Sequence, residues 1–166
     1  KCDAQNSRSL NHFVNVFEIY EIGPKIIDRL KDEGLVSDAT DLFILDKSDL
    51  AGLERFGFKS AENIINSINN HRKVSLWRFI YALGIPQVGE QTAHDLADYF
   101  KTLDKIKNAS VEEISSISNI GPVVSENIFN YFRDKHNIDF IDKLFKNGVS
   151  IEKEKKTEKS LAGKTF

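Results

Sequence analysis

A five-residue pattern recurs four times along the chain at an almost constant interval. Each copy has an apolar residue, two variable residues, a second apolar residue and a glycine. The copies end at Gly23, Gly57, Gly89 and Gly121, which are 34, 32 and 32 residues apart. A fixed interval of this size predicts a chain built from repeated supersecondary units. We interpret each glycine as a tight turn between two helices, at a positive φ that residues with a Cβ avoid.

The segments on both sides of each turn have the apolar spacing of amphipathic helices. Before the first turn, one helix face is formed by Leu10, Phe13, Val14 and Phe17. Asp46–Asp49 and Ser110–Glu113 have the pattern of capped helix starts. Gly34 is placed to end the helix after the first turn, and residues 137–145 predict a final helix. The sequence therefore predicts an all-α fold.

The repeats also match in pairs. Leu42, Leu50 and Leu53 of the second unit correspond to Ile106, Ile114 and Ile117 of the fourth, and the first unit corresponds to the third in the same way. We therefore expect four helix–hairpin–helix units in two pseudo-symmetric pairs, joined by residues 69–75. The expected units cover about residues 9–36, 37–71, 74–100 and 102–136 of a domain at 9–151.

Composition limits the function classes. The 166 residues are 40% apolar, enough for a core, and contain no apolar run of about 18 residues that would predict a membrane span. Cys2 is the only cysteine in the sequence, which fits a reducing cytoplasm. The chain lacks Met and begins at Lys1, so we expect a piece of a longer protein. We also expect this protein to be a monomer and to have no membrane partner.

The net charge is −2, and the tail from Glu152 to Lys164 has five lysines and three glutamates, which leaves about −4 for the body. DNA-binding proteins usually have a basic surface. Backbone N–H groups at a helix start bind phosphate without a side-chain charge, however. The expected DNA contacts are therefore at and beside the turns: Gly23, Lys25, Arg55, Gly57, Lys59, Ser60, Gly84, Gln87, Gly89, Gln91, Thr92, Asn119, Gly121 and Ser125.

Three segments carry a family resemblance. Phe79–Ala93, Asn119–Asn127 and Leu53–Asn63 resemble the helix–hairpin–helix domain of bacterial NAD-dependent DNA ligases, and the resemblance extends over essentially the whole chain. Cys2–Gln5, within residues 1–8, is similar to the exit from that family's four-cysteine zinc finger. After a charged linker at 152–160, residues 161–166 resemble the first strand of a BRCT domain.

The resemblance implies a role and a set of partners. The hairpins of this family grip double-stranded DNA at a nick, largely through the minor groove, while other domains seal it in replication and repair. NAD, Mg and Zn are implied for the parent ligase, with Cys2 as a zinc ligand only there. For this segment the resemblance implies no cofactor and no catalytic residue.

The third position of the pattern departs from the glycine found in many such hairpins. It holds Glu21, Arg55, Gln87 and Asn119. Because a carboxylate at Glu21 opposes a phosphate, we expect the first hairpin to pack rather than to bind DNA. Gly57, Gly89 and Gly121 are then expected to matter for binding and Gly23 mainly for folding.

Two other function classes stay open. A helix–hairpin–helix repair glycosylase needs a catalytic Asp after a hairpin, for which Asp139 and Asp142 are within reach, and a helical protein-interaction domain would keep the hairpins as structure only. Lys31–Gly34 is the string nearest to the ligase adenylation motif lysine-x-aspartate-glycine, but it falls at a helix end. His12, His71, His94 and His136 share no metal-ligand spacing, and Trp77 is expected to anchor the core rather than to stack on a base.

Overall fold

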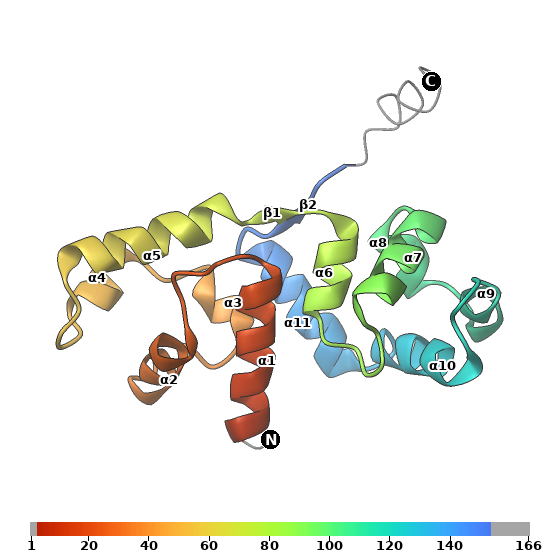
Figure 1. The fold of residues 1–166 in the computed structure, drawn as a ribbon, viewed down its shortest axis with the longest axis horizontal. Coiled ribbons are helices and arrows are strands. Elements are labelled where there is room, and N and C mark those ends of the chain that lie inside the picture. The colour runs from red at the N-terminus through yellow and green to blue at the C-terminus, as the bar shows by residue number, and fades with distance from the viewer. Residues whose placement is uncertain (1–2, 154–166) are drawn as a thin grey trace.

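The computed structural model describes residues 3–153 as an almost entirely helical chain with one short two-stranded sheet (Figure 1). The helices are α1 Asp3–Val16, α2 Pro24–Asp32, α3 Ala39–Leu42, α4 Lys47–Ala51, α5 Phe58–Asn70, α6 Leu76–Ala82, α7 Glu90–Phe100, α8 Leu103–Lys107, α9 Val111–Ser115, α10 Pro122–Tyr131 and α11 Lys135–Lys146. The strands are β1 Lys73–Val74 and β2 Ser150–Ile151. The all-α fold class is confirmed.

The expected helix start and stop signals act as the sequence indicates. Asp46 caps α4 in a capping box with Asp49, and Ser110 caps α9 by accepting a hydrogen bond from the N–H of Glu113. The Ser48 hydroxyl and the N–H of Asp49 lower the pKa of the Asp46 carboxyl, because both stabilise its charged form. Gly34 follows α2 at a φ of +75°, the left-handed conformation that ends many helices.

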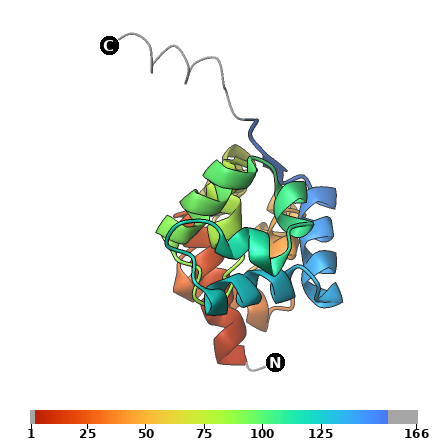
Figure 2. The same cartoon turned by 90° about the vertical axis from the view of Figure 1, so that its right-hand side faces the viewer.

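The four hairpins lie in two halves of one elongated body. In Figure 1, α1–α5 occupy the left and α6–α10 the right, and Figure 2 shows the right half end-on, with α11 running along its edge. α11 contacts both halves: it packs against α3, and its Phe145 ring stacks on Phe79 of α6 with centroids 5.2 Å apart. One continuous cluster of buried apolar side chains runs through both halves.

The halves meet where α1 packs against α6. His12 Nε2 lies 2.8 Å from the carbonyl oxygen of Tyr81, and the two rings meet edge to face. Arg78 Nη1 donates to the carbonyl oxygen of Val16 at 2.7 Å. These contacts fix the orientation of the first hairpin pair relative to the second.

A short parallel β-sheet, which the sequence analysis did not predict, lies between the two halves. Residues 73–74, inside the expected linker, pair with Ser150–Ile151 as parallel strands. Arg72 donates from Nη1 to the carbonyl oxygen of Asn147 and from Nη2 to that of Phe43, both at 2.7 Å. The C-terminal end of α11 is thereby tied to the first half.

The expected boundary between residues 8 and 9 falls inside α1. α1 begins at Asp3 and so includes residues that the sequence analysis assigned to a preceding segment. Of the expected zinc-finger remnant at residues 1–8, Lys1 and Cys2 lie outside the described residues, as do the BRCT-like residues 161–166 and residues 154–160 of the linker.

Candidate nucleic-acid interface

Each copy of the repeated pattern forms a β-turn. The N–H of the fourth residue donates to the carbonyl oxygen of the first residue in all four copies. The N–O distances are 3.2 Å for Ile22–Ile19, 3.1 Å for Phe56–Leu53, 3.0 Å for Val88–Ile85 and 3.1 Å for Ile120–Ile117. The repeat in sequence is thus a repeat in backbone hydrogen bonding.

The positive φ lies at the third position of the turn rather than at the glycine. Arg55, Gln87 and Asn119 have φ of 69°, 66° and 75°, as in a type II turn, where the third residue is left-handed and Pro favours the second. Pro86 occupies that second position in the third hairpin. Our expectation of positive φ at the fifth-position glycines was wrong, because the turn is already complete before the glycine.

The first hairpin is built differently. Glu21 is not at a positive φ; the left-handed residue is Glu18, at 63°, two residues after the end of α1. Glu21 is exposed, and so is Tyr20 beside it. The first turn therefore presents a different backbone shape and an exposed carboxylate, and its packing role stays a prediction.

Neither the backbone conformation nor the packing inside the chain requires glycine at the fifth position of the four patterns. Gly23, Gly57, Gly89 and Gly121 are extended N-cap residues with φ between −76° and −89°. A Cβ built on each of them meets no atom within 4 Å. A side chain at these positions would therefore extend into open space beside the exposed backbone.

The helices that follow the hairpins begin without a side-chain cap. This holds for α2, α5, α7 and α10. By contrast, Asp38, Asp46, Thr102, Ser110 and Asp134 cap α3, α4, α8, α9 and α11; α6 is the one other described helix with an N-cap residue but no side-chain cap. Because first-turn N–H groups have no acceptor within their own helix, the hairpin helices leave donors open for an anion.

Most of the expected contact residues are exposed around these helix starts: Lys25, Arg55, Gly57, Lys59, Ser60, Gly84, Gln87, Gly89, Gln91, Asn119 and Gly121. Gly23 and Thr92 are half-buried. Gly84 ends α6 at a φ of +69°. The expectation that Ser125 contacts DNA was wrong. Ser125 is buried, and its hydroxyl donates to the carbonyl oxygen of Gly121 at 2.8 Å. Its helical spacing placed it near the turn but could not show which way it faces.

Each hairpin pair is braced between its members. Arg29 of α2 donates from Nη2 to the carbonyl oxygen of Glu54, in the second hairpin, at 2.8 Å. Asn127 of α10 donates to the carbonyl oxygen of Pro86 at 3.0 Å and to Gln87 Oε1 at 3.1 Å, in the third hairpin. Both donors lie six residues after their own hairpin glycine, so the two braces are pseudo-symmetric. The Arg29 side chain thus positions a neighbouring turn.

Comparison with known proteins agrees with this geometry. Residues 13–70 match a family model described as a SAM-like helix-hairpin-helix tandem, and residues 78–141 match one described as a helix-hairpin-helix motif. DNA ligases from strains of Coxiella burnetii are 44% and 43% identical to the chain over 99% of its length. The chain is a helix–hairpin–helix segment of the DNA ligase family. It spans about a quarter of the length of these relatives.

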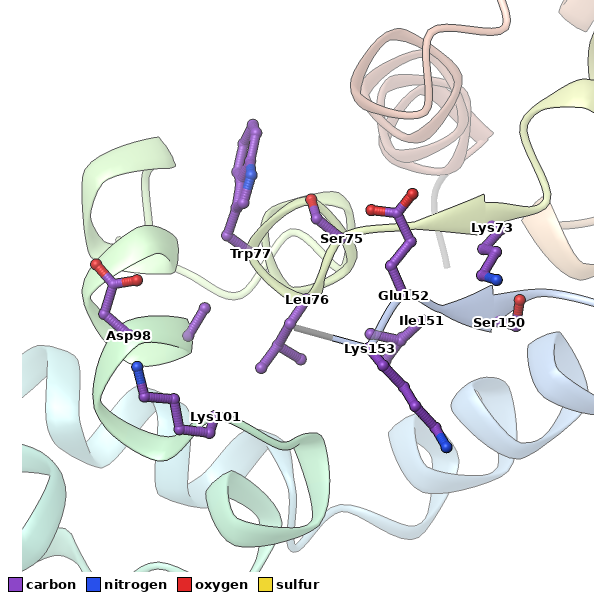
Figure 3. A pocket seen from close by; sticks show the side chains of 11 residues that line it. Lys73, Ser75, Leu76, Trp77, Asp98, Lys101, Ser150, Ile151, Glu152 and Lys153 are labelled. Carbon is purple, nitrogen blue, oxygen red and sulfur yellow. The ribbon is translucent and has the colours of Figure 1, made fainter. Parts of the chain in front are cut away.

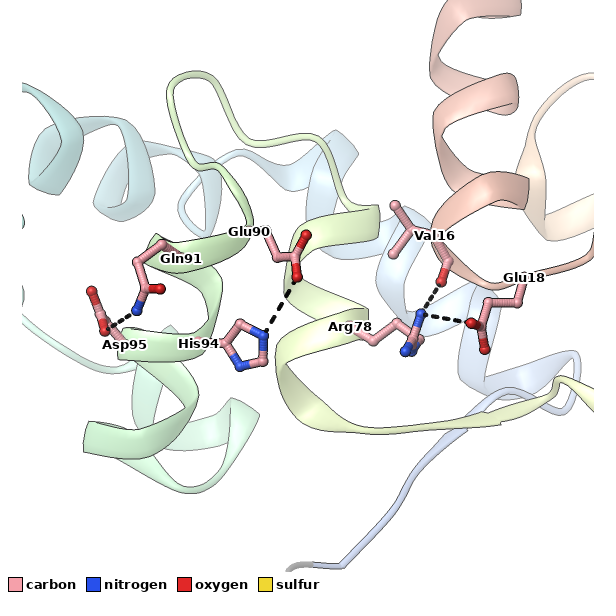
Figure 4. A network of polar contacts seen from close by, with 7 residues as sticks. All are labelled: Val16, Glu18, Arg78, Glu90, Gln91, His94 and Asp95. Carbon is pink, nitrogen blue, oxygen red and sulfur yellow. Dashed lines mark hydrogen bonds and ion pairs between the residues drawn. The ribbon is translucent and has the colours of Figure 1, made fainter.

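A group of side chains around Trp77, not predicted from the sequence, links the first and third hairpins of this helix–hairpin–helix segment. Figure 4 shows its two ion pairs, Glu90 with His94 and Arg78 with Glu18. At the start of α7, Glu90 lies 3.9 Å from His94, whose ring stacks on Trp77 at 4.0 Å. Arg78 lies over the same indole ring and 3.8 Å from Glu18 of the first hairpin. Trp77 is half-buried against the core and held between protein groups, in agreement with its expected anchoring role.

A cleft of about 900 Å³ lies away from the hairpin turns, between α6, α7 and the two strands (Figure 3). Trp77, Asp98, Lys101 and Lys153 are among its lining residues, but none of the expected DNA contacts is. The cleft carries both charge signs, and we do not include it in the interface.

The remaining candidate residues of the segment have structural surroundings. Lys31 Nζ donates to Ser7 Oγ at 2.9 Å. Asp139 and Asp142 are exposed on α11, and Asp139 pairs with Lys135 at 3.2 Å. Across residues 3–153, no group of three or more His, Cys, Asp or Glu side chains is arranged to hold a metal ion. Within the same range, no helix has the length and apolarity needed to cross a membrane.

Proposed function

We propose that the chain binds duplex DNA without base-sequence preference, through the helix starts of α5, α7 and α10. The observation that carries this proposal is the combination of an uncapped helix start with an N-cap glycine whose missing Cβ serves no internal purpose. A phosphate oxygen is the ligand that suits such a site, because N–H groups and the helix dipole both favour an anion. Contacts to phosphate position a protein but do not read sequence.

The relatives support DNA as the source of the phosphates, since they are named DNA ligases. Three uncapped helix starts of one kind suit a ligand that repeats the same anionic group, as a duplex does. The body's negative charge is compatible with this mode, because neutral N–H groups supply much of the contact. We exclude the first hairpin, where Glu18 and Glu21 surround the turn.

We further infer that the chain acts inside a longer, NAD-dependent ligase, as a monomer in the bacterial cytoplasm. There it would hold a nicked duplex through the minor groove during replication and repair, while other segments perform the chemistry. The segment itself lacks the groups for that chemistry: Lys31 is followed by Glu33 instead of Asp and is hydrogen-bonded to Ser7 at a helix end. The residues present do not fit a zinc site either, because Cys2 alone cannot supply four ligands.

The proposal is tested by placing a carboxylate at the helix starts. Asp is a good N-cap residue, so Gly89→Asp and Gly121→Asp should keep or raise the melting temperature. The same carboxylate occupies the phosphate position, so affinity for a nicked duplex should fall at least about tenfold, from the loss of charge-assisted hydrogen bonds worth roughly 1.5–3 kcal/mol. Fluorescence anisotropy at fixed salt measures the affinity.

Gly23→Asp is the matched variant in the first hairpin. It should change stability as little as the others and leave affinity within about twofold, since that turn is outside the proposed interface. Equal losses at Gly23, Gly89 and Gly121 would show that the ranking of hairpins is wrong. Unchanged affinity in Gly89→Asp and Gly121→Asp would remove the proposed function itself.

A further inference from the structure

The turn between α4 and α5 carries a compact cluster of side chains around one carboxylate. Lys47 Nζ lies 3.5 Å from Glu62 Oε2, and Lys59 Nζ lies 3.7 Å from Glu62 Oε1. Lys47 Nζ is also 5.7 Å from the centre of the Phe58 ring. The cluster joins the start of α4 to the first two turns of α5, so it forms only when the hairpin is folded.

Phe58 is the unusual member of this cluster. It is the first residue of α5, directly after the hairpin glycine, and its side chain is 66% exposed. The corresponding residues of the other hairpins are Pro24, Glu90 and Pro122. A single exposed apolar side chain is ordinary on a protein surface. An aromatic ring beside an open phosphate site, with a lysine over it, is better suited to a contact that has both an apolar and an anionic part.

The distribution of charge singles out the same turn. Neither residues 83–93 around the third hairpin nor residues 115–125 around the fourth contain a Lys or Arg. The α4–α5 turn has Lys47, Arg55 and Lys59, with Arg55 and Lys59 exposed. In a body with a net charge near −4, this turn is the one proposed DNA-contacting hairpin with cationic side chains.

We propose that Lys47, Arg55, Phe58 and Lys59 form a side-chain anchor for the sugar–phosphate backbone of duplex DNA. The anchor rests on the proposed function and adds a division of labour to it. The lysines and Arg55 neutralise phosphates, and the Phe58 ring packs on the apolar face of a deoxyribose. The third and fourth hairpins bind phosphate through backbone N–H groups without a cationic side chain beside the turn.

Glu62 has a regulating position in this anchor. It holds one lysine on each oxygen of its carboxylate, which keeps both ammonium groups beside the turn in the free protein. Exposed ion pairs of this kind are weak, so a phosphate can replace the carboxylate when DNA binds. Glu62 then opposes binding by competing for the lysines and by adding a negative charge near the DNA.

The experiment measures affinity for a nicked duplex and its dependence on salt, using the 166-residue chain and a series of variants. Lys47→Gln and Lys59→Gln should each lower affinity about three- to tenfold and reduce the slope of log K against log salt by about 1. Glu62→Gln should raise affinity about three- to tenfold at low salt. Phe58→Ala should lower affinity with the salt slope unchanged, because it removes no charge.

The chain provides matched controls at positions that we do not place at the DNA. Lys135 and Asp139 form an exposed pair with the same chemistry, at 3.2 Å on α11, so Lys135→Gln and Asp139→Asn repeat the charge changes elsewhere. Tyr99 is an exposed aromatic residue of α7, so Tyr99→Ala controls for the loss of a surface ring. All three controls should leave affinity within about twofold.

The outcomes separate the anchor from the proposed function. If Gly89→Asp and Gly121→Asp lose binding while the Lys47, Lys59, Phe58 and Glu62 variants match their controls, DNA binding stands and the anchor is wrong. If Glu62→Gln and Asp139→Asn gain affinity equally, net charge explains the effect and Glu62 has no local role. Absence of duplex binding by the unaltered chain would overturn both proposals.

Discussion

At the scale of single residues, the third position of each turn determines backbone strain. Arg55 and Gln87 adopt a left-handed conformation that costs residues with a Cβ about 1 kcal/mol or more relative to glycine. Glu21, at the same position of the first hairpin, has an ordinary φ. The fifth-position glycines are extended in all four hairpins and are not strained. Substitution by glycine should therefore have opposite effects in different copies of one pattern.

We expect Arg55→Gly to raise the free energy of unfolding by up to about 1 kcal/mol, because it relieves left-handed strain. Glu21→Gly should lower it by roughly 0.5–1 kcal/mol, because glycine adds freedom to the unfolded chain without relieving strain. Urea denaturation of both variants measures the two changes. A loss of stability in Arg55→Gly as large as that in Glu21→Gly would contradict the assignment of strain to this turn.

At the scale of elements, one hairpin positions its partner through a side chain of the following helix. Asn127 holds the tip of the third hairpin from α10, and Arg29 holds the second from α2. The bound carbonyl oxygens, of Pro86 and Glu54, are the second residues of their turns. In the second pair, the Asn127 brace keeps the uncapped helix starts of α7 and α10 at a fixed separation, a condition for binding two phosphates of one duplex together.

Asn127→Ala should lower the free energy of unfolding by about 0.5–1.5 kcal/mol, the net contribution of such a hydrogen bond. It should also weaken duplex binding, since the third turn loses its tether. Asn130→Ala, an exposed position on the same helix, controls for the change in helix propensity. Equal stability and affinity in the two variants would show that the brace does not hold the turn.

At the scale of the whole molecule, Arg72 ties the C-terminal end of α11 to the first hairpin pair. Besides its two bonds to the carbonyl oxygens of Asn147 and Phe43, its Nε donates to Asn69 Oδ1 at 3.0 Å, and its guanidinium lies over the Phe43 ring. Partial burial lowers the pKa of Arg72, but an arginine retains its charge at physiological pH. Asn147 adds a bond from its side chain to the carbonyl oxygen of Thr40.

We expect Arg72→Met to lower the free energy of unfolding by roughly 2–3 kcal/mol, because two half-buried carbonyl oxygens lose a charged donor. Arg8→Met, at an exposed site on α1, should change it by less than about 0.5 kcal/mol. Chemical denaturation monitored by Trp77 fluorescence compares them. A change in Arg72→Met no larger than in the control would mean that Arg72 does not stabilise the contact between α11 and the first half.

The sequence determined the features that depend on local spacing. The interval between glycines predicted four hairpins, the apolar periodicity predicted their helices, and Asp46, Ser110 and Gly34 marked helix ends correctly, because capping and turn formation involve residues only a few positions apart. The same local signals identified the helix starts that form the candidate interface.

Tertiary structure decided which way side chains face and which residues distant in sequence they contact. It turned Ser125 inward, paired residues 73–74 with 150–151, and brought Lys47 and Lys59 to the same carboxylate. It also moved the strained position from the glycine to the residue two places earlier. Helical spacing cannot supply these facts, because the face that a side chain takes and the partner it meets are set by packing between elements far apart in sequence.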